Sequence, residues 1–477
     1  MSLLYDIDRM FAYHDATKHS QASIRTTRHF LDWDNMPNPF RRYEGAPLVD
    51  LPADPPAPLT DAIAILHGAL PEEHHANGPD FFSRLFFYSA AISAWKAVPS
   101  MGYRYSLRVN PSSGNLHPTE FHFATQGVAG WEDGLYHYLP SDHACELRAR
   151  GVYGDARLQV FLTSIAWREA WKYRSRAYRY CLHDIGHAWQ SVALAARALG
   201  CGCSARGGFV DDDVAALLGV RDEWPMLILE IDGAGLPPFE QHEITPEFIS
   251  GLPNRLSAEY VDYPLIDAIH EATKMTEAGA QADFERAHAV AEMNGRPFGD
   301  TVRGRRSALD FIGGDRAISV EQLRTMLTAA SQPFVCDFGE RLITLYVFAH
   351  RVRGLAPGLY DQNLQLIREG DQRLWAAALS LGQNLAANSC VTFSMVADLE
   401  RAARRWGNRG YRYAHFQAGA IGQRFYVASE ALGFRSTGIG AFYDDEVHEY
   451  LKIRPEQGQV IYHFASGYPV HDERIEG

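Results

Sequence analysis

The chain has 477 residues, of which 46% are hydrophobic and 22% are charged, and its formal net charge is −13. This length exceeds that of one ordinary domain, and the composition is typical of a globular protein rather than a disordered one. The acidic balance argues against nucleic acid as a partner, because phosphate backbones are bound by basic surfaces.

The sequence indicates neither a membrane nor a metal. The N-terminus lacks the basic and apolar regions of a signal peptide, and no apolar run approaches the ~20 residues that cross a bilayer. We therefore expect a cytoplasmic protein without a membrane partner. The six cysteines lack the paired CxxC spacing of a zinc site, and Cys201 and Cys203 are expected to be buried thiols.

In chain order, we expect residues 1–80 to form an N-terminal arm that lies over the core, with a proline-rich stretch at 51–58. Residues 81–235 predict a first domain, with a strand at 121–125, a helix at 178–199 that ends at Gly200, and a strand at 226–231. Residues 236–302 predict a connector with a helical middle at 265–294. Residues 303–477 predict a second domain, in which Ser319 and Gln322 form the capping box of a helix.

A polar loop stands out between two apolar segments of the first domain. It contains Pro111, Ser112, Ser113, Gly114 and Asn115. Glycine permits close approach of the backbone, and short hydroxyl and amide side chains both donate and accept hydrogen bonds. The loop is therefore suited to contact a flat polar ligand. The alternative is an ordinary turn built of turn-forming residues.

A basic element opens the second domain, where Arg305, Arg306 and Ser307 precede the helical part. Guanidinium groups pair with phosphate oxygens in a fork geometry, so this element can bind a phosphate. A solvated basic turn is the alternative.

The chain repeats itself after 233 residues: Arg176–Tyr180 matches Arg409–Tyr413, and Phe209–Asp212 matches Phe442–Asp445. One repeat of this length indicates two fused domains rather than a solenoid. Because each half mixes strands with long helices, we predict an α+β fold in which the halves form a covalent dimer. The repeated Tyr178, Arg179 and Tyr180 are expected at the interface between the halves or in the core.

The two halves also differ. In place of the polar loop the second half has residues 332–338, without the serine pair or the amide. In place of the Arg-Arg-Ser element the first half has only a degenerate counterpart, Arg41 to Tyr43. Each half therefore keeps a different part of one site.

These elements, together with the Tyr-Arg-Tyr helices and a glycine loop at 435–442, resemble the nitroreductase superfamily of FMN enzymes. More closely they resemble its azoline-oxidising branch, the dehydrogenases of the SagB, McbC and thiazoline-oxidase type. The resemblance covers about residues 80–235 and 303–470. It implies two tandem nitroreductase-like domains, each a small, mostly antiparallel sheet flanked by helices, that form a pseudo-dimer with FMN at their interface.

Carried onto this chain, the resemblance implies that the basic element binds the FMN phosphate, the polar loop meets the ring, and the glycine loop reaches flavin oxygens. Leu309 departs from the pattern, since many relatives have a basic residue there. The symmetry-related site, which would need residues 41–43 and 333–337, is expected to be empty. The implied cofactor-binding residues are Arg305, Arg306, Ser307, Pro111, Ser112, Ser113, Asn115, Arg435, Gly438 and Gly440.

Lys172 and Tyr173 resemble the Lys-Tyr pair to which proton abstraction is assigned in azoline oxidases, and the second half has Arg405 and Trp406 instead. A lysine becomes a usable base only if burial or nearby cations, here Arg174 and Arg176, lower its pKa from ~10.4. The alternative is a solvated lysine beside a packing tyrosine. Asp184 and His187, one helical turn apart, are assigned to the core.

The function implied is that of an FMN-dependent oxidoreductase, which dehydrogenates an azoline-type heterocycle or an amino-acid-derived group in a peptide or small metabolite. One alternative is an NAD(P)H-dependent reductase of nitroaromatics or quinones. Another is a non-catalytic pseudo-dimer scaffold that binds a peptide. We expect a pseudo-dimeric monomer and leave further dimerisation open.

Overall fold

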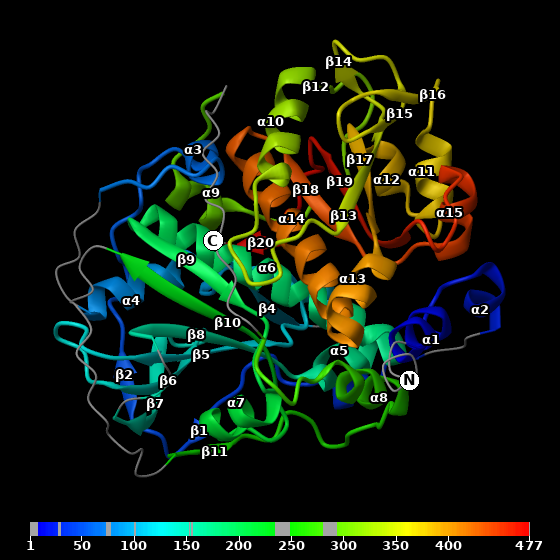
Figure 1. Ribbon diagram of the computed structural model, residues 1–477. Coiled ribbons are helices and arrows are strands. Elements are labelled where there is room, and N and C mark those ends of the chain that lie inside the picture. The colour runs from blue at the N-terminus through cyan, green and yellow to red at the C-terminus, as the bar shows by residue number, and fades with distance from the viewer. Residues whose placement is uncertain are drawn as a thin grey trace.

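The computed structural model describes residues 8–26, 30–72, 78–99, 102–151, 153, 156–233, 249–279 and 293–476. Each half is built on one antiparallel sheet with helices against it (Figure 1). The sheet of the first half has seven strands in the order β2-β7-β6-β5-β8-β10-β9. Their bounds are β2 (Leu48–Asp50), β5 (Thr119–Thr125), β6 (Gly134–Leu139), β7 (Ala144–Arg150), β8 (Leu158–Ser164), β9 (Cys201–Arg206) and β10 (Trp224–Gly233).

The sheet of the second half has six strands in the order β16-β15-β13-β17-β19-β18, so the two halves share the inner strand order. Its strands are β13 (Ile343–Ala349), β15 (Gly358–Asp361), β16 (Leu366–Glu369), β17 (Val391–Ala397), β18 (Arg435–Ile439) and β19 (Gln459–Gly467). The predicted α+β class with mostly antiparallel sheets is confirmed, and the strands predicted at 121–125 and 226–231 lie within β5 and β10.

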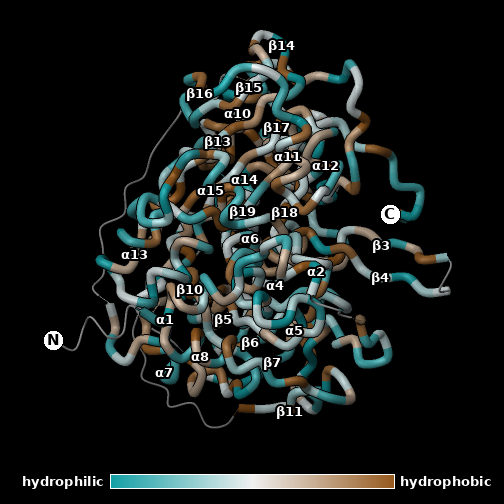
Figure 2. Tube along the Cα trace, turned by 90° about the vertical axis from the view of Figure 1, so that its right-hand side faces the viewer, coloured by the Kyte–Doolittle hydropathy of each residue, from teal (hydrophilic) through white to brown (hydrophobic). Residues whose placement is uncertain are grey.

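Two 22-residue helices, α6 (Ala177–Ala198) and α14 (Gly410–Ala431), lie in the middle of the molecule and pack on each other (Figures 1 and 2). Their close approach requires glycine at the crossing. A Cβ at Gly186 would lie 2.2 Å from the carbonyl oxygen of Phe416, and one at Gly419 would lie 2.1 Å from that of His183. These contacts correspond under the 233-residue offset, so the helices cross about a pseudo-twofold axis.

The same symmetry appears in the ion pairs between the halves. Asp444 of the second half pairs with Arg176 and Arg179 of the first. In the matching place, Asp211 of the first half pairs with Arg409 and Arg412 of the second. Arg179 thus lies at the interface, one of the two places expected for it. One hydrophobic core runs through both halves, with a smaller cluster in each.

Shorter helices cover the sheets, and the described residues include no helix with the length and apolar character needed to cross a membrane. They are α1 (Asp8–Ala16), α2 (Gln21–Thr26), α3 (Ala62–Leu66), α4 (Gly78–Phe87), α5 (Ala166–Tyr173), α7 (Asp211–Leu218), α8 (Pro264–Thr273), α9 (Phe298–Gly304), α10 (Val320–Ser331), α11 (Arg373–Leu379), α12 (Asn384–Asn388), α13 (Leu399–Trp406) and α15 (Asp444–Leu451). The capping box of Ser319 and Gln322 begins α10 as predicted.

The N-terminal segment is part of the fold rather than a covering layer. Helix α1 inserts Tyr13 between Tyr178 and Tyr411, and β2 is the edge strand of the first sheet. In the connector, the helix expected at 265–294 is not continuous, because α8 ends at Thr273 and residues 274–279 are not helical. Residues 280–292 lie outside the described part of the chain.

A small three-stranded sheet extends from the first half. The hairpin of β3 (Ile92–Val98) and β4 (Tyr103–Arg108) pairs with β20 (Ile475–Glu476), so the end of the chain returns to the first half (Figure 2). Strand β4 leads directly into the polar loop, and the hairpin thereby forms one wall of the site described below. Two minor pairs complete the structure, β1 (Tyr43–Glu44) with β11 (Leu252–Pro253) and β12 (Ile318–Ser319) with β14 (Val352–Arg353).

Candidate cofactor site

A cavity of about 460 Å³ lies between the two halves. The first half contributes the end of β4, the polar loop and side chains of α5 and α6. The second half contributes α14, β18 and the segment that follows α9. Among its lining residues are Pro111, Ser112, Ser113, Asn115, Tyr173, Arg305, Arg306, Ser307, Gly438 and Gly440. Of the expected site residues, only Lys172 and Arg435 are not among those that line it.

The polar loop is fixed by its own hydrogen bonds. The amide of Asn115 donates to the carbonyl oxygen of Ser106 at 3.0 Å, and the backbone N–H of His117 donates to the hydroxyl of Ser112 at 2.8 Å. Gly114, Asn115 and His117 have positive φ, an unusual backbone that persists only where the surroundings hold it. The loop is therefore a preformed surface.

The basic element reaches across to this loop. Arg305 donates from Nε to the carbonyl oxygen of Val109 and from Nη2 to that of Arg108, each at 2.9 Å. Arg306 donates to the backbone carbonyl of Ser93 at 2.9 Å. Ser307 shares a 2.8 Å hydrogen bond with the phenol of Tyr426, which also accepts from the backbone N–H of Gly438. The two elements, almost 200 residues apart in sequence, thus form one site.

Within the part of the chain that the structure describes, neither Arg305 nor Arg306 forms an ion pair, although the charge of Glu430 acts on both. Burial lowers the pKa of Arg305, and burial together with the charges of Arg305 and Arg435 lowers the pKa of Arg306 to about 10. Within the described residues, Nη1 of Arg305 and Nε of Arg306 are buried without a hydrogen-bond partner. Unpaired buried donors on cations are costly, so this end of the cavity favours an anion. Arg435 itself donates to Glu430 at 3.3 Å on a neighbouring surface. It acts on Arg305 and Arg306 only through its positive charge.

The glycine segment presents bare backbone to the cavity. A Cβ at Gly438 would lie 2.0 Å from the hydroxyl of Tyr462, and one at Gly440 would lie 2.0 Å from the ring of Tyr180. Residues 435–439 form strand β18, so most of the segment expected as a glycine loop is extended backbone. Any side chain here would displace the aromatic groups that shape the cavity.

Lys172 and Tyr173 lie at the end of α5, against the polar loop. A Cβ at Gly114 would be 2.7 Å from the phenol oxygen of Tyr173 and 3.0 Å from Nζ of Lys172. Burial, reinforced by Glu169, raises the pKa of Tyr173 well above its usual value and keeps the phenol neutral. Of the two cations expected near Lys172, Arg176 is engaged elsewhere because it donates to Asp444, and Arg174 is exposed.

Sequence reasoning placed Asp184 and His187 in the core, but both line the cavity. Asp184 accepts from the backbone N–H and the hydroxyl of Ser113 at 3.1 and 3.0 Å. His187 lies 3.2 Å from the hydroxyl of Tyr462, and burial lowers its pKa to about 3. Tyr180, Tyr426 and Tyr462 also line the site. The signal that could have found the buried pair is the repeat itself, which has Gln417 and Ala420 in their places.

The space related by symmetry to the cavity is occupied by protein side chains. Asp337 accepts from the backbone N–H groups of Gly207 and Gly208, each at 2.8 Å. Phe338 stacks on Tyr413 with ring centroids 4.2 Å apart, and a Cβ at Gly207 would meet both rings. Gly207 and Tyr413 match Gly440 and Tyr180 of the cavity, so the corresponding space is occupied.

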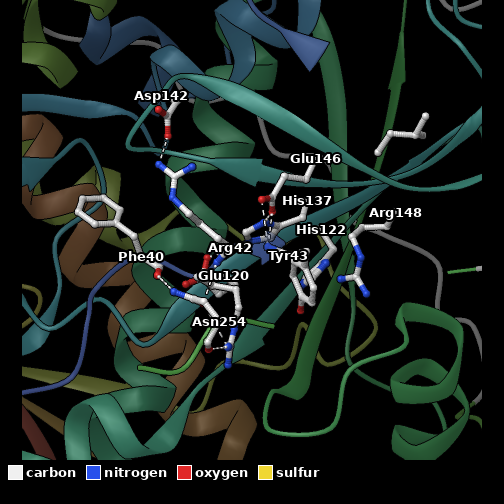
Figure 3. Close-up of polar contacts among 12 residues, drawn as sticks. Phe40, Arg42, Tyr43, Glu120, His122, His137, Asp142, Glu146, Arg148 and Asn254 are labelled. Carbon is white, nitrogen blue, oxygen red and sulfur yellow. Dashed lines mark hydrogen bonds and ion pairs between the residues drawn. The ribbon is translucent and has the colours of Figure 1, made fainter. Parts of the chain in front are cut away.

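The degenerate arginine element is used differently as well. Arg42 pairs with Asp142, and the backbone N–H of Tyr43 donates to the carboxylate of Glu146, which also bonds His137 (Figure 3). Arg41 bonds Glu223 at 2.9 Å. Within the described residues, the hydrogen bonds and ion pairs of residues 41–43 do not reach 333–337. Arg41 and Arg42 are thus each paired with carboxylates of their own half rather than directed toward the second half.

Comparison with known proteins gives a consistent picture. A model of the nitroreductase family matches residues 89–233 and 302–468. The protein "Putative nitroreductase MJ1384" of Methanocaldococcus jannaschii is 32% identical over 117 residues, which are 24% of this chain and 59% of that protein. "Trifolitoxin operon protein TfxC" of Rhizobium leguminosarum bv. trifolii is 29% identical over 108 residues, 21% of this chain and 30% of that protein. The aligned parts thus span less than two thirds of these curated relatives.

A crystal structure described as a putative nitroreductase from Anabaena variabilis superposes with a TM-score of 0.76 at 26% identity, covering 97% of this chain and 99% of that one. The likeness therefore extends to the tandem arrangement of both halves. Since the family model matches more than half of the residues, in two segments that correspond to the two halves, this chain belongs to the nitroreductase family of oxidoreductases.

Proposed function

We propose that the protein binds FMN in the cavity between its halves and dehydrogenates an azoline-type heterocycle, or a related amino-acid-derived group, in a peptide or small metabolite. The composite cavity carries this proposal, because cations of one half face a polar, ring-sized cradle of the other. It supports one flavin site per chain.

The residues present fit the two ends of FMN. The buried, unpartnered nitrogens of Arg305 and Arg306 suit a phosphate, and Ser307 adds a hydroxyl. Residues 111–115 and the bare backbone of Gly438 and Gly440 suit the flat ring, since added side chains would clash there. Bound flavin would supply the hydride acceptor, which no protein side chain can provide.

The dehydrogenase direction is favoured by the groups around the polar loop. Removal of hydrogen from a ring carbon needs a hydride acceptor and a group that takes a proton. Tyr173 and Lys172, which are expected to assist proton removal, lie beside Gly114, and both belong only to the half that carries the loop. The relative named for the trifolitoxin operon agrees with a biosynthetic role.

The test compares two arginines. Arg306→Ala removes a charged donor, worth about 1.5–3 kcal/mol, and should weaken FMN binding roughly 10- to 150-fold. Arg42→Ala, which breaks only a surface ion pair, should bind FMN as the unchanged protein does. Fluorescence titration of the apoprotein with FMN measures both. Equal loss from both variants, or no binding of FMN by the unchanged protein, would refute the proposed site.

The direction of the reaction is tested with the reconstituted protein under anaerobic conditions. Bleaching of the flavin absorbance by a thiazoline-containing peptide supports dehydrogenation. Bleaching by NADPH alone, with no response to the peptide, would favour the nitroaromatic or quinone reductase instead. A protein that binds peptide but no flavin would favour a scaffold.

A further inference from the structure

Two buried carboxyl groups lie next to the polar loop of residues 111–115. Asp184 lines the cavity and is hydrogen-bonded to Ser113, and Glu169 of α5 is fully buried behind it. Neither oxygen of Glu169 makes a hydrogen bond of ordinary geometry within the described residues, although Ser112 is its polar neighbour. A carboxyl pair in such a place is costly to keep, because burial disfavours the charged form.

The second half of the repeat shows whether these two positions require a carboxyl group. The matching residues are Gln417 and Ala402, on the side where the site is filled. Gln417 holds its segment as Asp184 holds the polar loop: it accepts from Leu342 at 2.9 Å and donates to the carbonyl of Glu340 at 2.8 Å. Holding a loop therefore needs no charge. The carboxyl pair occurs only where the cavity does.

The surroundings place Asp184 near its titration point at neutral pH. Burial raises the pKa of Asp184 to about 7, against the opposing hydrogen bonds of Ser112 and Ser113. Burial, with the nearby charge of Asp184, also raises the pKa of Glu169, while Lys172 opposes this. Three other titratable groups interact with the charges of Asp184 or Glu169. Burial raises the pKa of each, so they are neutral at neutral pH: Tyr173, Cys181 and Tyr462. Lys172 is a cation close enough to act on Glu169.

We propose that Asp184, backed by Glu169, accepts the proton that leaves the substrate during dehydrogenation, and that Lys172 acts as the cation that stabilises the carboxylate. This inference rests on the proposed function. The proton leaves one ring carbon for the carboxylate, its electron pair forms the new ring double bond, and a hydride leaves the neighbouring carbon for the flavin. The substrate is oxidised, the flavin is reduced, and Asp184 ends as the neutral acid.

The first test needs no substrate. The midpoint potential of bound FMN is measured from pH 5.5 to 8.5 by spectroelectrochemistry, for the unchanged protein and for Asp184→Asn. Above pH 7 an ionised Asp184 beside the cavity disfavours added electrons, so the Asn variant should have the more positive potential. Near pH 5.5 Asp184 is neutral, and the two potentials should coincide. Asp337→Asn, which alters a half-buried carboxylate in the symmetry-related space outside the cavity, should show no difference at any pH.

The second test uses the thiazoline peptide. Asp184→Asn should retain flavin and slow its anaerobic bleaching at least 100-fold, with loss of the acid limb of the rate profile near pH 7. Asp184→Glu should restore that limb. Potentials that differ equally at every pH, or an unchanged bleaching rate in the Asn variant, would overturn the inference. Failure of FMN to bind, or of the peptide to bleach the unchanged protein, would instead reject the proposed function.

Discussion

Replacing Asp444 with Asn removes a buried charge that joins the two halves beside the cavity. Its carboxylate lies 3.1 Å from Nη1 of Arg176 and 2.9 Å from Nη1 of Arg179, and all three side chains are buried. Asp211 holds the matching pair of arginines on the other side of the pseudo-twofold axis. The two carboxylates therefore serve as each other's control.

The expected loss of stability follows from the uncompensated charge. Removing one partner of a buried ion pair costs about 3–5 kcal/mol, and Asn leaves almost no cavity. Both Asp444→Asn and Asp211→Asn should lower the free energy of unfolding by about this amount in urea titrations at pH 7. Similar losses are expected because each carboxylate faces two buried arginines.

The effect has a definite pH dependence. Burial alone would raise the pKa of Asp444, but Arg176 and Arg179 outweigh it and hold the pKa below its usual value. The carboxylate then contributes its full stability above the unfolded-state pKa of ~3.9, and loses it as the pH falls through the lower folded-state value. The difference between the unchanged protein and the variant should close only in acid.

Flavin binding should separate the two variants. Arg176 also donates to the carbonyl of Gly440 in the cavity wall, whereas Arg409 donates to Gly207, where Asp337 fills the space. Asp444→Asn should therefore weaken FMN binding, and Asp211→Asn should not, under conditions where both variants are folded. Equal effects on FMN binding, or a loss below about 1 kcal/mol in both variants, would refute this account of the interface.

Two further substitutions test the close packing of helices α6 and α14 and the role of Lys172. Gly419→Ala places a methyl 2.1 Å from the carbonyl oxygen of His183 and should lower the stability by at least about 1–3 kcal/mol. Gly304→Ala, whose methyl would lie 3.7 Å from Oε1 of Glu430, should cost far less, and equal thermal midpoints of the two variants would contradict the close packing. Lys172→Ala should keep the flavin absorbance and lose dehydrogenation of the thiazoline peptide, while Arg405→Ala, the exposed counterpart, should keep both; unchanged turnover in the lysine variant would remove Lys172 from the mechanism.

Much of the architecture could be read from local pattern. Hydrophobic periodicity placed α6 and the strands β5 and β10, because one buried face of each element imposes its period on the sequence. The offset of 233 residues revealed two related halves, and their differences suggested that each kept part of one site. The continuous connector helix predicted at 265–294 was wrong, because α8 ends at Thr273 and residues 274–279 are not helical.

By itself, the sequence determined that two similar α+β halves are joined, and that a phosphate-type element and a ring-type loop survive in different halves. Only the tertiary structure decided that these elements touch, that Asp184 and His187 line the cavity, and that Asp337 and Phe338 fill the matching space. The reason is physical. Periodicity reports which face of an element is buried, but whether a buried polar group meets protein or open space depends on segments that are distant in the chain.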